Sequence, residues 1–211
     1  AHVAKLLFQH EQTSHLTVTS EGLPVGHLRI EPTIEEKTAQ RHLAFRGNLS
    51  VQLPQAVRQR FHGNGILKMD QAMDFEHLTL EFIIKDPVYY RVEIQIEKGE
   101  NLVHFTTQES QEGAPETRAY TLDEAGASSM IKDLGIDPTM ARAVGSTNSI
   151  RPEISARQSS LQIHGERADT YLITVTQSGQ TLLDAHVSQI GQLLSIKTFL
   201  GYTLAPEDLT P

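Results

Sequence analysis

Histidine is the residue type in this chain with the widest range of possible chemistry. The sequence has ten, and His27, His77, His104, His164 and His186 all fall on the polar positions of alternating polar and apolar segments. Imidazoles gathered on one sheet face can bind zinc, copper or nickel, and they titrate near neutral pH. The simpler interpretation is a solvated face that uses histidine as one more polar residue. We favour the simpler one, because a site needs facing side chains and the spacing requires none.

Two other groups resemble metal sites only in part. His10 and His15 are five positions apart in the run HEQTSH, whereas the zinc-protease motif needs two histidines four apart on one helix face. Asp70, Asp74 and Glu76 lack the alternating ligands and the glycine of a calcium loop. We therefore expect no metal site and no bound cofactor.

The sequence also lacks the motifs of nucleotide and hydrolase chemistry. It has no G-x-S-x-G or Walker loop, and Gly63-Asn64-Gly65 has no third glycine of a dinucleotide-binding loop. The absence of cysteine excludes disulfides, thiolate catalysis and cysteine-bound metals. No catalytic residue can be nominated, so we expect a protein that is not an enzyme.

Composition excludes further partners. The 18 Lys and Arg are outnumbered by 26 Asp and Glu, which gives a formal charge of −8, and no segment is a run of cations. Nucleic acids require clustered cations, so they are not expected as partners. No apolar run is long enough for a spanning helix, and Ala1 is not followed by a signal peptide. Membrane association would then require an N-terminal anchor preceding residue 1.

Strands must position whatever site exists, because two-residue alternation of apolar and polar side chains recurs along the chain. It is cleanest at 90–97, and it continues through a meander at 168–203 with glycine-containing turns at 178–180 and 189–192. We also expect strands at 5–9 and 15–19.

Glycines and polar runs mark the expected breaks between these strands. The run 62–65 predicts a turn, and the polar run 109–117 predicts a loop.

The predicted fold is mainly β: one curved antiparallel sheet of about ten to twelve strands, forming a half-barrel or open barrel. The exception is a short helical insertion at 123–146, where Gly135 ends one helix and Asp137-Pro138 begins another. We expect one β-rich domain over residues 1–211, with a loose polar tail at 205–211.

The alternation also predicts which side chains line the dry face of the sheet. These residues are aromatic or aliphatic, lie on the inward positions of their strands or in the insertion, and form our candidate ligand-binding set: Phe45, Leu80, Phe82, Tyr90, Val92, Ile94, Phe105, Met130, Tyr171 and Ile173. A curved sheet with an apolar concave face under short helices is one way to build an apolar cavity.

The order of these elements resembles a known class of protein. The segments SEGLPVGHL at 20–28, VSQIGQLL at 187–194 and LGYTL at 200–204, with the mid-chain insertion between them, are similar to bacterial cell-envelope domains of unknown function. Those domains are related in architecture to periplasmic lipoprotein carriers, whose incomplete barrel encloses an apolar cavity. The resemblance implies an extracytoplasmic location, in the periplasm or cell envelope of a bacterium, and supplies no catalytic residues.

Three functions follow as hypotheses. The leading one is a non-enzymatic domain that holds a lipid, another apolar small molecule or a lipidated partner in the concavity of the sheet. The second is an assembly module of a larger envelope complex that binds a protein partner through its edge strands. The third is a metal-dependent hydrolase that uses the strand histidines.

Overall fold

The fold is a single antiparallel sheet of thirteen strands in the described part of the chain. The computed structural model describes residues 2–9, 11–52, 58–85, 89–121, 123, 126, 129, 153–163, 165–177 and 180–209. The predicted mainly β, curved open sheet is confirmed, with slightly more strands than expected. Of the predicted insertion at 123–146, only Asp123, Gly126 and Ser129 are described, and the latter two are helical.

In the described part of the chain, the elements with defined bounds are a helix, thirteen strands and a short 3-10 helix. Their bounds are α1 His2–Gln9, β1 Ser14–Ser20, β2 Leu23–Ile34, β3 Arg41–Gln52, β4 Arg58–Met69, β5 Phe75–Ile84, β6 Tyr90–Glu97, β7 Leu102–Gln108, β8 Glu116–Thr121, β9 Glu153–Ile163, β10 Glu166–Gln177, β11 Gln180–Ser188, β12 Leu193–Thr198, β13 Tyr202–Ala205 and η1 Glu207–Leu209. The predicted strand at 90–97 is confirmed. The predicted tail at 205–211 includes the last residue of β13 and all of η1.

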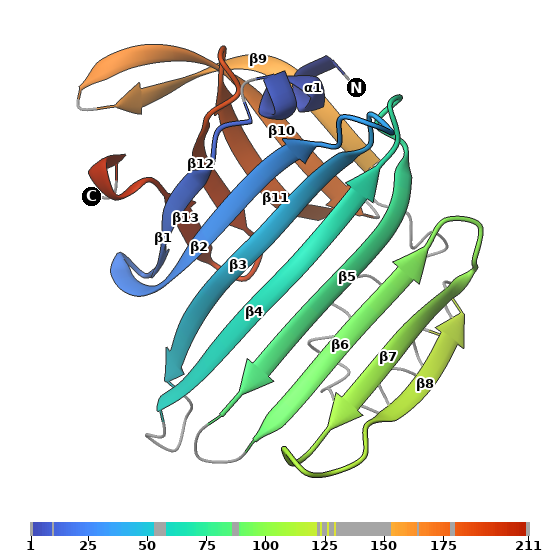
Figure 1. The fold of residues 1–211 in the computed structure, drawn as a ribbon. Helices are drawn as coiled ribbons and strands as arrows, with labels where there is room; N and C mark the ends of the chain where they lie inside the picture. Colours follow the sequence, from blue (N-terminus) through green and yellow to red (C-terminus); the bar gives the residue numbers. More distant parts are fainter. Residues whose placement is uncertain are drawn as a thin grey trace.

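Neighbouring strands in the chain are almost always neighbours in the sheet. The order is β8-β7-β6-β5-β4-β3-β2-β1-β13-β12-β11-β10-β9, so the N-terminal strand pairs with the C-terminal one through Thr17–Ala205 and Ser20–Tyr202. Among the described strands, β8 and β9 form the two edges. Figure 1 shows β1 to β8 as one broad surface, with β9 to β13 continuing it beyond β1.

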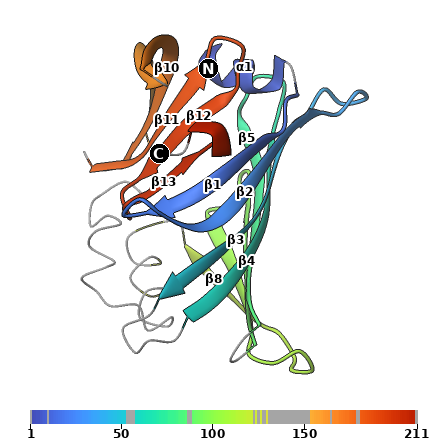
Figure 2. The same ribbon diagram turned by 90° about the vertical axis from the view of Figure 1, so that its left-hand side faces the viewer.

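The sheet is strongly curved where these two parts meet. Of the four register shifts between described strands, three lie in the pairs β1–β2, β10–β11 and β11–β12. Each bulge adds a residue to one strand and increases local twist and bending. Seen from the side, β10 to β13 are inclined to the surface formed by β2 to β5 (Figure 2).

The main core lies at this curved end. Leu16, Val18, Val187, Ile196 and Leu204 belong to one buried cluster, and Val187 is completely inaccessible to solvent. A second, smaller cluster of Val103, Phe105 and Tyr120 lies near the β8 edge. The apolar face of the sheet between the two clusters is only partly covered by described residues.

The predicted strand at 5–9 is wrong, because residues 2–9 form α1. Phe8 of this helix is 2% exposed, and Leu7 packs against the main core. An eight-residue helix is marginal in isolation, so tertiary packing of Leu7 and Phe8 determines its conformation. The period-two pattern of the segment did not reveal this contact.

The predicted turn at 62–65 is also wrong, since β4 runs straight through both glycines. Gly63 lies opposite Gly47 and Phe82, and Gly65 lies opposite Phe45 and Leu80. These glycines leave room for large side chains on the same face of neighbouring strands. The loop predicted at 109–117 is shorter than expected, because β8 begins at Glu116.

The two glycines of β4 provide a matched test of this packing. A Cβ on Gly63 would meet Phe82 at 3.5 Å, an ordinary contact, whereas a Cβ on Gly65 would lie 2.6 Å from Leu80 Cδ2 and 3.2 Å from the Thr79 carbonyl oxygen. We expect Gly65→Ala to lower the free energy of unfolding by about 1 kcal/mol or more. Gly63→Ala should be neutral or slightly stabilising. Urea denaturation of both variants measures the difference, and equal effects would contradict this account of β4.

Candidate apolar binding site

The strand register brings the apolar positions of distant strands onto one face of the sheet. Residues directly opposite in antiparallel strands project from the same side. One such row joins Tyr90, Ile84, Phe61, Leu49, Gly26, Val18, Leu204, Ile196, Ala185 and Ile173 across ten strands. This row of the concave face is therefore apolar across the ten strands from β6 to β10 in the sheet order, through β1 and β13.

A cavity of about 510 Å³ lies on this face where the sheet curves. Its volume is within the range of small-molecule sites, about 300–1,000 Å³. The side chains that enclose it are aliphatic or aromatic and come from β1 to β5 on one side and from the β12–β13 hairpin on the other: Val18, Leu28, Phe45, Leu49, Phe61, Leu80, Phe82, Leu200, Tyr202 and Leu204.

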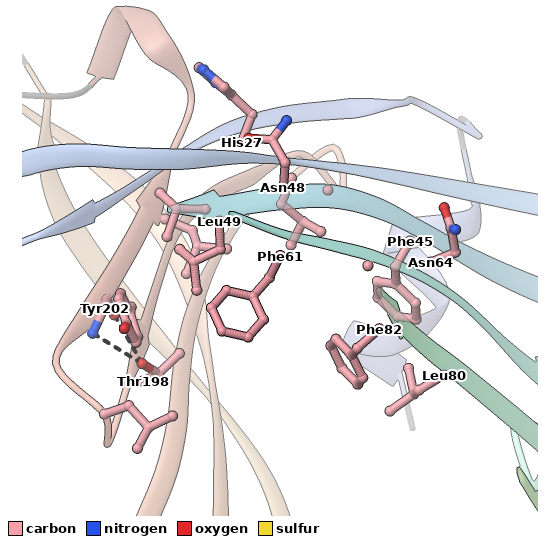
Figure 3. Close-up of a pocket in the computed structure, with 16 residues that line it drawn as sticks. His27, Phe45, Asn48, Leu49, Phe61, Asn64, Leu80, Phe82, Thr198 and Tyr202 are labelled. Atoms are coloured by element: carbon pink, nitrogen blue, oxygen red, sulfur yellow. Dashed lines mark hydrogen bonds between the residues drawn. The ribbon is translucent and has the colours of Figure 1, made fainter. Parts of the chain in front are cut away.

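Polar residues border the cavity without supplying free polar groups to it. In Figure 3, Phe45, Leu49, Phe61 and Phe82 lie on one side of the strands, while His27 and Asn48 point away on the other side. The hydroxyl of Thr198 donates a hydrogen bond to the Tyr202 carbonyl and accepts one from its amide, both at 3.2 Å. The cavity thus offers dispersion contacts and almost no hydrogen-bonding groups.

Glycines form part of the cavity floor. Gly47 and Gly63 are paired with each other, and both line the cavity between Leu28 and Phe82 of the adjacent strands. Two neighbouring positions without side chains leave a hollow on a face that is otherwise covered by large residues. Phe82 remains 41% exposed beside this hollow.

Three of the residues predicted to bind an apolar ligand, Phe45, Leu80 and Phe82, line this cavity. The others with described positions share the face but lie beyond it. Val92 and Ile94 pack against Phe105 in the cluster at the β8 edge. Tyr90 continues the row of Phe61 and Ile84.

The remaining predicted residues lie in β10 or outside the described part of the chain. Ile173 packs against the main core, and Tyr171 is paired with the buried Val187. Met130 is outside the described residues. The predicted set therefore marks the concave face, and only part of it surrounds the cavity.

Several cavity residues were not predicted from the sequence. Phe61 directly precedes the glycine run that was interpreted as a turn, which hid its place in β4. Leu200 and Tyr202 lie at the tight connection of β12 and β13, and only the pairing of β13 with β1 brings them opposite β3 and β4. The apolar character of LGYTL is visible in the sequence, but its position in the fold, beside the cavity, is not.

His77, His104 and His186 lie on the opposite, convex face and have separate surroundings, whereas His27 lines a pocket of that face with His15 and His62. His77 contacts Thr79 at 2.7 Å, His104 contacts Glu100 at 3.2 Å, and His186 contacts Thr170 at 3.1 Å. Burial lowers the pKa of His186. Within the described ranges, no three His, Asp or Glu side chains are arranged to hold a metal ion, and His164 lies outside those ranges.

No protein-family model matches the chain. No curated protein matches its sequence either. A crystal structure described as a beta-barrel-like protein of domain of unknown function DUF1849 from Brucella abortus is similar, with a TM-score of 0.46 and 9% identity over 92% of each chain. Among the described residues, none of the helices is long and apolar enough to cross a membrane.

On the convex face, an arginine bridges two carboxylates that face each other. Glu81 and Glu93 are direct partners in β5 and β6, and Arg91 donates hydrogen bonds to Glu81 at 2.5 Å and to Glu93 at 2.6 Å. The hydrogen bond from Arg91 lowers the pKa of Glu81, and the hydrogen bond to Glu81 raises the pKa of Arg91. The bridge offsets a like-charge pair that would otherwise destabilise the sheet.

The lowered pKa of Glu81 makes this contribution pH-dependent. A carboxyl whose folded-state pKa lies below its unfolded value stabilises the fold above the unfolded value, and this stabilisation is lost as the pH falls through the folded value. We expect Glu81→Gln to reduce the free energy of unfolding by about 1 kcal/mol at neutral pH. The difference from the parent should disappear in acid. Urea denaturation across a pH series measures it, and a pH-independent difference would contradict the bridge.

Proposed function

We propose that this protein binds an apolar molecule, either the acyl chain of a lipid or the lipid anchor of a partner, in the cavity on its concave face. The observation that carries the proposal is the lining of that cavity, where aliphatic and aromatic side chains from five strands and one hairpin surround about 510 Å³. Burying apolar ligand surface there is favourable by about 25 cal/mol per Å².

The surroundings of the cavity support a ligand that arrives from an apolar phase. Leu200, which lines the cavity at the β12–β13 turn, is 60% exposed, and Leu23 at the start of β2 is 68% exposed. The two turns are adjacent, because Ser20 pairs with both Leu23 and Tyr202. Large exposed apolar residues beside an apolar cavity are typical of a site that contacts a membrane or a hydrophobic partner.

The resemblance of the turn sequences to envelope domains supports an extracytoplasmic location for this activity. The proposal is of binding without chemistry, since the described lining of the cavity is almost entirely apolar and His27 points away from it. It therefore concerns storage or transfer of the ligand.

Native mass spectrometry of gently purified protein tests the proposal. We expect an additional mass that is released by organic extraction and identified as an acyl-containing molecule. Titration of the stripped protein with a fluorescent fatty acid should then restore saturable binding of one molecule per chain. Protein that carries no lipid and shows no saturable binding of the fatty acid would refute the proposed function.

A further inference from the structure

The convex face carries a second pocket over strands β1 to β4, and its lining mixes polar and apolar groups. Its volume is about 490 Å³. Its lining residues come from these strands and η1: His15, Leu16, Thr17, His27, Leu28, Arg29, Arg46, Gly47, Asn48, His62 and Glu207. Two arginines and one glutamate line this pocket, whereas the chain as a whole has a charge of −8.

Two arginines in this pocket occupy a position that is costly for like charges. Arg29 in β2 and Arg46 in β3 are direct cross-strand partners, and like charges directly opposite each other destabilise a sheet. Glu31 forms an ion pair with Arg29 and thus offsets one of the two charges. Within the described part of the chain, Arg46 has neither an ion-pair nor a hydrogen-bond partner.

The same row of the sheet contains a facing pair of acids, and there a side chain of opposite charge bridges the pair. The row continues from Arg46 through Asn64 to Glu81 and Glu93. There the two facing acids are bridged by Arg91, a side chain of opposite sign. The two facing arginines have no equivalent bridging anion among the described residues.

We propose that the pocket over β1 to β4 binds a phosphate group, which takes the bridging position between Arg29 and Arg46. Guanidinium groups donate several hydrogen bonds in a planar fork that matches phosphate oxygens. Asn48 lies between His27 and His62 in the cross-strand register, so three further side chains with N–H donors line the same pocket. Glu207 borders the pocket from η1, Glu31 lies beside Arg29, and Arg46 also lines a neighbouring pocket with Glu81 and Glu93. The phosphate is therefore confined to the position between the two arginines.

This site is separate from the apolar cavity and lies on the other face of the same strands. The phosphate can come from two sources, a free phosphorylated small molecule or the headgroup of a phospholipid. The two sources present the same group to the arginines, so an experiment with both is needed to distinguish them.

Titration with inorganic phosphate, followed through the backbone amide resonances and the arginine side-chain resonances, tests the proposal. Sodium chloride at equal ionic strength serves as the reference, because salt alone screens the repulsion between the arginines. We expect saturable shifts at Arg29, Arg46 and Asn48. Arg46→Gln should weaken phosphate binding about tenfold or more, while Arg167→Gln, at an exposed arginine of β10, should leave it unchanged.

Thermal stability provides a second readout that does not depend on the resonances. Phosphate should raise the Tm of the parent protein more than chloride does, and this gain should be absent in Arg46→Gln. Failure of phosphate to shift Arg29 and Arg46, or an equal effect of Arg46→Gln and Arg167→Gln, would overturn the site.

Vesicles identify the source of the phosphate. Cosedimentation with phosphatidic acid vesicles that is lost in Arg46→Gln would assign a lipid headgroup. Phosphate binding without vesicle binding would assign a free small molecule. Vesicle binding that persists unchanged in Arg46→Gln, without phosphate binding, would refute the proposal.

Discussion

Replacement of Phe82 by aspartate is expected to weaken binding of a fluorescent fatty acid about a hundredfold. Phe82 lines the apolar cavity and is 41% exposed, so an aspartate there keeps its hydration in the free protein. A bound acyl chain would lose the contact with the ring and would desolvate the carboxylate, which together cost about 3 kcal/mol. That free energy corresponds to about a hundredfold in affinity.

The matched control for this variant is Ile66→Asp. Ile66 is 42% exposed and lies in the adjacent strand β4, but it projects from the convex face, opposite Ala44 and Thr79. We expect its affinity for the fatty acid to stay within about twofold of the parent, because the site is independent. Similar losses in both variants would show that the concave cavity is not where the fatty acid binds. Circular dichroism of both proteins establishes that they are folded.

Replacement of Gly26 by alanine is expected to reduce the free energy of unfolding by about 3 kcal/mol or more. A Cβ at this position would overlap the carbonyl oxygen of Asn48 in β3, so the two strands would have to separate. The register shift between Val18 and Thr19 is immediately adjacent, where the sheet bends. Backbone contacts cannot yield as a flexible side chain does, which places the cost at the upper end for overpacking.

This loss of stability is measured by urea denaturation, with Gly63→Ala as the control substitution on the same face. The control should be nearly neutral, since its Cβ meets the Phe82 ring and the Glu81 carbonyl oxygen at ordinary distances. If Gly26→Ala were as stable as the parent, that result would contradict the close contact between β2 and β3 that shapes the cavity. A reduced affinity of Gly26→Ala for fatty acids should accompany the loss.

The architecture was predictable wherever one face of a strand is dry. The alternation at 90–97 identified β6, and the glycine-containing turn at 189–192 separated β11 from β12. The failures have physical causes. Residues 2–9 become helical because Phe8 finds a buried site, and β4 passes through Gly63 and Gly65 because neighbouring strands fill the space that those glycines leave.

The candidate sites were predictable only in part, because both depend on register between strands. Parity along β3 and β5 identified Phe45, Leu80 and Phe82. The opposing wall of the cavity is formed by Leu200 and Tyr202. These two residues lie opposite β3 and β4 only because the first strand pairs with the last. The facing arginines are seventeen positions apart and give no cluster in the sequence, so their juxtaposition needed the β2–β3 register.

A spin-labelled fatty acid tests the central claim most directly, since it broadens the methyl resonances near its binding site. With doxyl-stearate added to protein labelled in its Leu and Ile methyl groups, we expect selective loss of the signals of Leu28, Leu49 and Leu80. The signals of Ile154 and Ile190, which are exposed and do not line the cavity, should persist. Broadening of Ile154 and Ile190 with intact signals from the three leucines would contradict an apolar binding site on the concave face.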